Sequence, residues 1–217
     1  MRTAKTVLTV IQERGKQKKP IERVYKLLFN RELYLNAYAK LYPNNGAMTK
    51  GVTDETVDGM SIQKIDRMIE ILREEKYQWK PTRREYIKKK NGKKRPLGIP
   101  IWGDKVLQEV MRQILEAYYE PQFSEHSHGF RPNRGCHTAL QEIQVWKGTR
   151  WFIEGDISQY FDTIDHKILL EILARNIHDG RFIRLVSNML EAGYLEEWKF
   201  NQTISGVPQG GVISPIL

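Results

Sequence analysis

The sequence lacks the features that mark several large classes of protein. Cys136 is the single cysteine among 217 residues, which excludes an intramolecular disulfide framework and a cysteine-based zinc cluster and favours a reducing cytoplasm. No run of about 18 apolar residues is present, so no segment is expected to span a membrane. The apolar patch from Val7 to Ile11 is too short for a signal peptide. What remains is a soluble globular protein, with 40% apolar and 28% charged residues.

Positive charge is abundant and concentrated in one window. The net charge is +9, and residues 80–95 hold nine basic side chains against one acid, Glu85. A localised basic stripe in a folded protein favours a partner that carries phosphates. The alternative is a solvated face that only aids solubility. The stripe lacks the helical apolar face of a membrane anchor, so membrane binding is not expected.

Apolar residues at helical spacing predict most of the regular structure. Such spacing predicts a helix from Pro20 to about residue 42, and two more that Ser61 and Asp104 are expected to cap. Further helices are expected around 137–147 and 166–177. No internal repeat or flexible linker separates these segments.

Strand signals lie between the helices. The pair Asn91-Gly92 is a strong turn signal and predicts a β-hairpin within 83–99. A second hairpin is expected over 195–205, and the apolar run 151–156 fits a buried strand. Helices and hairpins mixed in this way predict an α+β fold.

One carboxylate stands at the end of the expected buried strand. Strand alternation sends Phe152, Glu154 and Asp156 to the same face. A carboxylate held on a rigid element is a good Mg²⁺ ligand. Taken alone, an acid in this position is more often a helix cap or a solvated residue.

Four segments together resemble group II intron reverse transcriptases, which are also called maturases. They correspond in order to two fingers motifs, to the palm motif with the first catalytic aspartate and to the Pro-Gln-Gly motif beneath the incoming nucleotide. The segments are 86–100 (YIKKKNGKKRPLGIP), 123–137 (FSEHSHGFRPNRGCH), 156–166 (DISQYFDTIDH) and 206–215 (GVPQGGVISP).

The resemblance implies an organisation and an activity. It implies reverse-transcriptase fingers at 55–147 and the first part of the palm at 148–217, preceded by a helical N-terminal extension at 1–54. The activity is RNA-directed DNA polymerisation, a nucleotidyl transfer that copies intron RNA into DNA for retrotransposition. The expected partners are intron RNA, which the protein also helps to splice, a DNA or RNA primer and deoxynucleoside triphosphates. Two Mg²⁺ ions are the expected cofactors.

The same resemblance implies roles for individual residues. Asp156 would be a ligand shared by both metal ions, and the carbonyl of Ile157 would touch the ion on the nucleotide side. Phe161 would exclude a ribose 2′-hydroxyl. The other residues that would contact the nucleotide are Lys89 and Arg95 on its triphosphate, the backbone N–H groups of Gln159 and Tyr160, and Gln209 beside it.

RNA contacts are expected from the basic hairpin and from the Gly/Pro-rich loop. The hairpin residues are Lys88, Lys90, Lys93 and Lys94, and the loop residues are Arg131 and Arg134. For the two arginines, hydrogen bonding within their own loop is an equal alternative. The loop histidines His126, His128 and His137 lack a clear fourth ligand, so a zinc site is not expected.

The sequence also departs from the family pattern. Lys88 replaces a usual Pro, Ser158-Gln159 a usual Lys-Gly, and His128 a usual Tyr. No Asp-Asp dipeptide occurs, so the second metal-binding motif, Tyr-x-Asp-Asp, is expected downstream. The chain is therefore interpreted as a fragment that is inactive alone. Two alternatives remain open: an RNA-binding splicing cofactor without polymerase chemistry, and a retron or CRISPR-associated reverse transcriptase.

Overall fold

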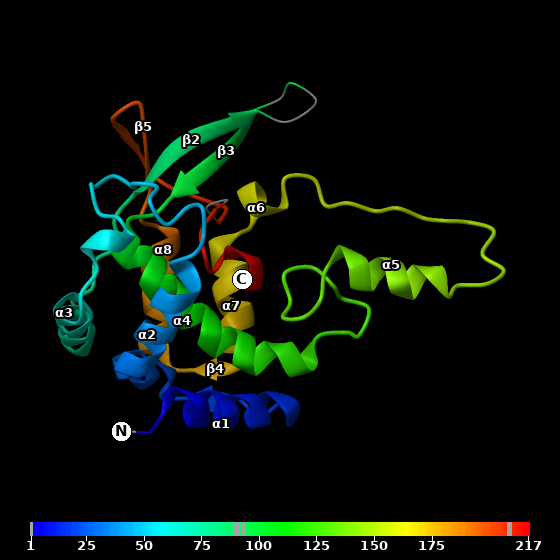
Figure 1. Ribbon diagram of the computed structural model, residues 1–217, viewed down its shortest axis with the longest axis horizontal. Helices are drawn as coiled ribbons and strands as arrows, with labels where there is room; N and C mark the ends of the chain where they lie inside the picture. The colour runs from blue at the N-terminus through cyan, green and yellow to red at the C-terminus, as the bar shows by residue number, and fades with distance from the viewer. Residues whose placement is uncertain (1, 89–91, 93, 208–209) are drawn as a thin grey trace.

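The computed structural model describes residues 2–88, 92, 94–207 and 210–217 (Figure 1). Helices and short strands alternate along the chain, so the α+β expectation is confirmed at that level. The α-helices are α1 (Ala4–Lys16), α2 (Arg31–Leu41), α3 (Ile62–Arg73), α4 (Trp102–Tyr119), α5 (Cys136–Gln144), α6 (Tyr160–Thr163), α7 (His166–Ala174) and α8 (Gly180–Leu190). The strands are β1 (Ile21–Glu22), β2 (Thr82–Lys88), β3 (Lys94–Ile99), β4 (Ile177–His178), β5 (Tyr194–Glu196) and β6 (Lys199–Asn201). Short 3₁₀ helices cover Val24–Phe29, Val57–Gly59, Glu120–Gln122 and Ser214–Ile216.

Helix α4 is the centre of the hydrophobic core. Its residues 104–111 are all buried, as expected for a helix segment enclosed by other elements, and its second half buries one face. Helices α1 and α2 pack directly on it, and Figure 1 shows it crossing the middle of the molecule. The fully buried residues of α4 include Val106, Leu107, Val110, Met111, Ile114, Leu115 and Tyr118.

Helix α1 is absent from the expectations drawn from the sequence. It begins at Ala4, where the side chain of Thr3 caps it by accepting a hydrogen bond from the N–H of Thr6. At its other end, Gly15 lies so close to α4 that a Cβ would stand 2.0 Å from the carbonyl oxygen of Tyr118. Only glycine allows this approach. The helices of 1–54 therefore share the core with α4, and the proposed division into extension, fingers and palm stays a prediction.

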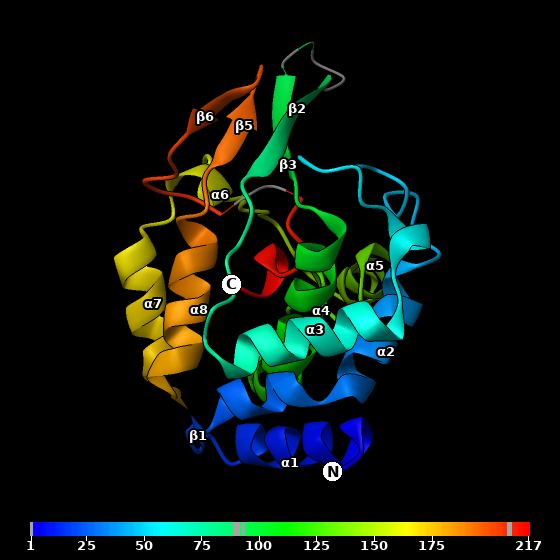
Figure 2. The same ribbon diagram turned by 90° about the vertical axis from the view of Figure 1, so that its left-hand side faces the viewer.

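The predicted hairpin of 83–99 is confirmed as β2 and β3, which pair antiparallel. Its sheet continues through β5 and β6 in the order β3-β2-β5-β6, where β2 and β5 run parallel. Strands β5 and β6 form the second predicted hairpin. Figure 2 shows this sheet at one end of the molecule, above α7 and α8. The tip residues Lys89, Lys90, Asn91 and Lys93 lie outside the described residues.

An arm of 123–159 projects away from the body (Figure 1). It contains the second fingers motif, α5 and the extended stretch that leads to α6. No residue of α5 is buried. The exposed apolar side chains of this arm include Phe130, Leu140, Val145, Trp146, Trp151, Phe152, Ile153 and Ile157.

Three expectations for local structure are wrong. Residues 151–156 form no strand and are all exposed, because no described strand lies alongside to satisfy their backbone groups. The segment after Pro20 is a two-residue strand and a 3₁₀ helix before α2. Asp104 does not cap α4, which begins at Trp102 without a side-chain cap. Instead Asp104 is buried and accepts hydrogen bonds from the Tyr77 hydroxyl at 2.6 Å and the backbone N–H of Lys80 at 3.1 Å.

Among the described residues, no helix is both long and apolar enough to cross a membrane.

Candidate functional site

Three of the four motif segments meet below the hairpin. The backbone N–H of Val207 donates to the carbonyl of Phe161 at 2.7 Å, and that of Gly206 donates to Ile164 at 2.8 Å. His166 fixes the same turn through Nε2, which lies 2.7 Å from the carbonyl oxygen of Gly206. The Pro-Gln-Gly segment is thus tied to the palm motif, although about forty residues separate the two along the chain.

Two glycines allow these close approaches. Gly206 has φ +86°, and a Cβ there would stand 2.7 Å from the carbonyl oxygen of Phe161. Gly210 has φ +104°, and a Cβ there would stand 2.6 Å from Leu97 Cδ1 on β3. A side chain at either position would meet atoms already in place. The glycines therefore bring the hairpin, α6 and the Pro-Gln-Gly segment into one unit.

Phe161 lines a pocket of 360 Å³ on one face of the hairpin. The pocket walls include Arg84, Pro96 and Gly98. Strand alternation sends Arg95, the neighbour of Pro96, to the opposite face, and Arg95 is not among the residues that line this pocket. The joint contact of Phe161 and Arg95 with one nucleotide stays a prediction.

Gln159 occupies a backbone conformation that favours glycine. It precedes α6 with φ +54°, and its carbonyl accepts hydrogen bonds from the N–H groups of Asp162 at 2.9 Å and Thr163 at 3.1 Å. The family that the sequence resembles usually has glycine here, and glycine adopts this conformation without a steric penalty. Tyr160 follows half-exposed, with its ring edge-on to Phe161 at 5.4 Å.

Four of the described cations of the hairpin form two pairs with different surroundings. Arg83 donates to the carbonyl of Lys50 at 2.9 Å, and Arg84 stacks on the Tyr194 ring at 3.4 Å. Arg84 thus links β2 to β5, and Arg83 links β2 to the loop that contains Lys50. Lys88 and Lys94 are exposed and stand directly opposite each other in the ladder, an arrangement of like charges that destabilises a sheet.

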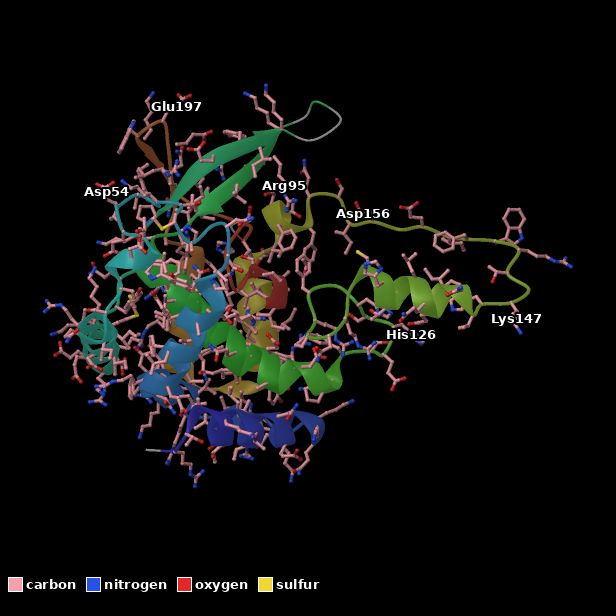
Figure 3. All side chains as sticks on the ribbon, in the orientation of Figure 1. Asp54, Arg95, His126, Lys147, Asp156 and Glu197 are labelled. Atoms are coloured by element: carbon pink, nitrogen blue, oxygen red, sulfur yellow. The ribbon has the colours of Figure 1, made fainter. Side chains whose placement is uncertain are left out.

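Asp156 is exposed on the stretch that enters α6. Figure 3 shows it where the arm joins the body, below the hairpin that carries Arg95. Within the described part of the chain, no three His, Cys, Asp or Glu side chains gather closely enough to hold a metal ion. Ile157 is also exposed. The described residues thus supply one carboxylate and do not by themselves complete a two-metal site.

The loop that contains the second fingers motif is held by its own charges. Arg131 is only 8% exposed; its Nη2 donates to Glu120 at 2.9 Å and its Nη1 to the Ser127 carbonyl at 2.7 Å. Arg134 donates to the carbonyl of Glu125. These hydrogen bonds agree with the alternative in which the two arginines order their own loop. Direct contact of both arginines with RNA stays a prediction.

His126 and His128 meet a single carboxylate, Glu142 on α5. His128 Nε2 lies 2.8 Å from Glu142 Oε2, and His126 contacts the other oxygen. The hydrogen bonds from His128 and then His126 hold the pKa of Glu142 below its usual value. The two imidazoles therefore fasten the loop to α5.

Other expected site residues fall outside the described part of the chain. Among the expected contacts to nucleotide, Lys89 and Gln209 lie there, and so do the RNA-binding candidates Lys90 and Lys93. Sequence reasoning also missed Gln108, a buried residue of α4 whose side-chain oxygen accepts the N–H of Val212 at 2.9 Å. No sequence signal singled out Gln108, because Asp104, Lys105 and Arg112 lie on the same side of the helix.

Comparison with known proteins decides the family. The family model described as reverse transcriptase (RNA-dependent DNA polymerase) matches residues 87–217. The chain belongs to the reverse transcriptase family. The matched region runs from the hairpin through the Pro-Gln-Gly segment and includes all four motif segments except Tyr86, the first residue of the first one.

The relatives of this reverse transcriptase chain include intron-encoded proteins. The group II intron-encoded protein LtrA of Lactococcus lactis subsp. cremoris is 50% identical over 197 residues, which are 90% of this chain and 33% of the relative. A 91 kDa protein in the cob intron of Schizosaccharomyces pombe is 46% identical over 222 residues, 99% of this chain and 28% of the relative. The mitochondrial nuclear intron maturase 1 of Arabidopsis thaliana is 37% identical over 93 residues, 42% of this chain and 13% of the relative.

The resemblance to group II intron proteins is thereby confirmed. The chain spans about a third of the length of LtrA. Reverse transcriptases generally use divalent metal ions. Which residues of this chain hold such ions, nucleotide or RNA belongs to the proposal that follows.

Proposed function

We propose that this chain is the fingers and first palm portion of a group II intron reverse transcriptase that copies intron RNA into DNA and binds that RNA as a maturase. The observation that carries the proposal is the junction described above. There the hairpin, the palm motif and the Pro-Gln-Gly segment are fastened together by Val207, Phe161 and Gly210. These are the segments expected to surround an incoming deoxynucleotide.

The hairpin supplies the charge for the polyanion. Lys88 and Lys94 face each other across the ladder at a cost to sheet stability, and neutralisation by phosphate removes that cost. Arg83 and Arg84 anchor the sheet beneath them. In the proposal Lys89 and Arg95 bind the triphosphate, while Lys88, Lys90, Lys93 and Lys94 bind RNA.

Asp156 is the proposed catalytic carboxylate. It lies at the junction of the arm and α6, and it contributes one metal ligand, together with the carbonyl of Ile157. The remaining ligands are proposed to come from a Tyr-x-Asp-Asp motif beyond Leu217. In the same arrangement, Phe161 and Gln209 select and position the deoxynucleotide, and Gln159 and Tyr160 offer backbone N–H groups to its phosphates. The proposed partners also include a primer and deoxynucleoside triphosphates. The proposed location is the cytoplasm.

Primer extension on an RNA template tests the catalytic assignment in a protein of the relatives' full length. Asp156→Asn should lower the extension rate more than a hundredfold, since it removes a charged metal ligand, and should leave RNA affinity unchanged. Asp165→Asn is the matched control. Asp165 caps α7 by accepting the N–H of Ile168 at 3.0 Å, and asparagine caps equally well. If Asp156→Asn retains extension within about tenfold of the parent, a barrier change of about 1.4 kcal/mol, the assignment is wrong.

A salt titration tests the RNA-binding assignment in the 217-residue chain. Neutralising Lys88, Lys90, Lys93 and Lys94 together should reduce the log–log salt slope by up to about 3, since each phosphate contact on a single strand contributes about 0.7. The control neutralises the same number of exposed lysines away from the hairpin tip, namely Lys5, Lys26, Lys167 and Lys199. If both variants have the same log–log salt slope, the basic stripe is only a solvated face that aids solubility.

A further inference from the structure

A second concave surface lies on the side of the molecule remote from Asp156. It is a groove of 460 Å³ between α3 and the start of α4. Figure 1 shows α3 on the opposite side of the body from the arm, and Figure 3 labels Asp156 on the arm side. The groove is therefore separate from the proposed nucleotide site.

Cationic side chains surround this groove. Lys64, Arg67, Lys76 and Lys80 all line it, against a single exposed acid, Glu55. Lys76 pairs with Glu74 at 2.9 Å. Among the described residues, no ion pair engages the side chains of Lys64, Arg67 or Lys80. The rim is thus positive and open to an anionic partner.

The floor of the groove is apolar and adaptable. Met60, Met68 and Ile71 line it with half-buried side chains, and Trp102, which is only 3% exposed, borders it. Methionine side chains adapt their shape and make favourable contacts with aromatic rings. The floor therefore offers an apolar surface of adjustable shape to a planar ring.

Gly103 keeps the floor open. A Cβ at this position would meet only Met68 Cε at 3.5 Å and Glu55 Oε2 at 3.9 Å, which are ordinary contacts. The space above Gly103 is therefore available to a ligand, and a side chain placed there would project into the groove.

We propose that this groove binds single-stranded RNA, with one unstacked nucleobase against the floor of Met60, Met68 and Ile71 and its flanking phosphates on Lys64 and Arg67. The proposal rests on the proposed function as an RNA-binding protein and adds a second contact surface to it. Proteins that bind single strands combine cations that contact the phosphates with side chains that support the unstacked bases, and this groove has cations and an apolar floor in the same place. A docked amphipathic helix is disfavoured, because it requires a longer apolar stripe than this enclosed floor offers.

Filling the groove tests the contact with the base. The probes are a fluorescein-labelled 12-nucleotide RNA of mixed sequence and an abasic oligomer of the same length and charge. Gly103→Leu should weaken binding of the intact RNA about tenfold, leave the abasic oligomer unchanged and leave the salt slope unchanged. Gly103→Ala, whose added methyl group fits the existing space, should bind both probes within twofold of the parent chain.

Neutralising the rim tests the contact with phosphate. Lys64→Gln with Arg67→Gln should lower the salt slope for both probes by about 1.4, which corresponds to two phosphate contacts. Lys5→Gln with Lys167→Gln, two exposed lysines remote from the groove, removes the same charge and should leave the slope unchanged. Photocrosslinking of the RNA through 4-thiouridine should label Met60, Met68 or Ile71.

Three outcomes would overturn the proposal. The first is intact RNA that binds the Gly103→Leu chain as tightly as the parent. The second is crosslinks that map only to other parts of the chain, which decides the matter even if Gly103→Leu fails to fold. The third is displacement of the RNA by an acidic amphipathic 12-residue peptide of equal charge that also binds the Gly103→Leu chain more weakly than the parent. That result would assign the groove to a protein partner. RNA binding that depends on the hairpin lysines but not on the groove would leave the proposed function intact, whereas no RNA binding at all would remove both.

Discussion

The body and the arm carry equally specific motifs but differ in the tertiary contacts that hold those motifs in place. In the body, Leu107 is fully buried and Gly206 is locked against the backbone of Phe161. In the arm, α5 buries no residue, and Trp151 and Ile153 are 87% and 94% exposed. Burial of apolar surface is the main stabilising term in folding. A motif can therefore be complete in sequence while its conformation is still set by few tertiary contacts.

The largest expected contrast is between buried and exposed leucines. Leu107→Ala in α4 should lower the free energy of unfolding by about 3–5 kcal/mol, since it removes a buried side chain and leaves a cavity. Leu140→Ala in α5 should change it by less than about 0.5 kcal/mol, because that side chain is exposed. Urea denaturation followed by circular dichroism measures both. Similar losses would mean that the arm packs on the body in solution.

A second contrast compares two glycines. Gly206→Ala should destabilise by about 3 kcal/mol, because a Cβ would collide with the Phe161 carbonyl and φ is +86°. Gly155→Ala in the arm meets nothing within 4 Å and should cost less than about 0.5 kcal/mol. The midpoints of urea unfolding compare them. A neutral Gly206→Ala would show that the Pro-Gln-Gly segment is not fastened to α6.

The contributions of Asp104 in the body and Glu142 in the arm to stability should change in opposite directions with pH. Burial raises the pKa of Asp104 to about 6, so its stabilising contribution is present below about pH 4 and is lost as the pH rises through 6. Relative to Asp104→Asn, the parent should lose about 2 kcal/mol of stability between pH 4 and pH 7.5. Glu142 in the arm has a lowered pKa, so its contribution is lost on acidification. Parallel pH profiles for the parent chain and Asp104→Asn would contradict the burial of this carboxyl.

The smallest expected effect lies where the arm joins the body. Gln159→Gly should stabilise the chain by about 0.5 kcal/mol, because φ is +54° at this position and glycine adopts that conformation without a steric penalty. Ser158 does not have a positive φ, so Ser158→Gly should be neutral or destabilising. Thermal unfolding of the two variants compares them. A destabilised Gln159→Gly would show that the glutamine side chain makes contacts that outweigh its backbone strain.

Local signals predicted the elements whose causes are local. Asn91-Gly92 predicted the hairpin, and Ser61 was correctly expected to cap α3, where its side chain accepts the N–H of Lys64. The family also followed from the sequence, because its motifs are long contiguous strings. Residues 151–156 had the apolar pattern of a strand, yet a strand requires neighbours, and none of the described strands lies beside them.

The sequence by itself determined the family, the basic hairpin and the candidate carboxylate Asp156. Only the tertiary structure decided that Asp104 is a buried acceptor, that Gly15 allows α1 to touch α4, and that a basic groove forms beside α3. The physical reason is the distance along the chain between the residues that interact. Turns, caps and motifs depend on residues within a few positions, whereas burial and concave surfaces depend on segments that meet only after the chain has folded.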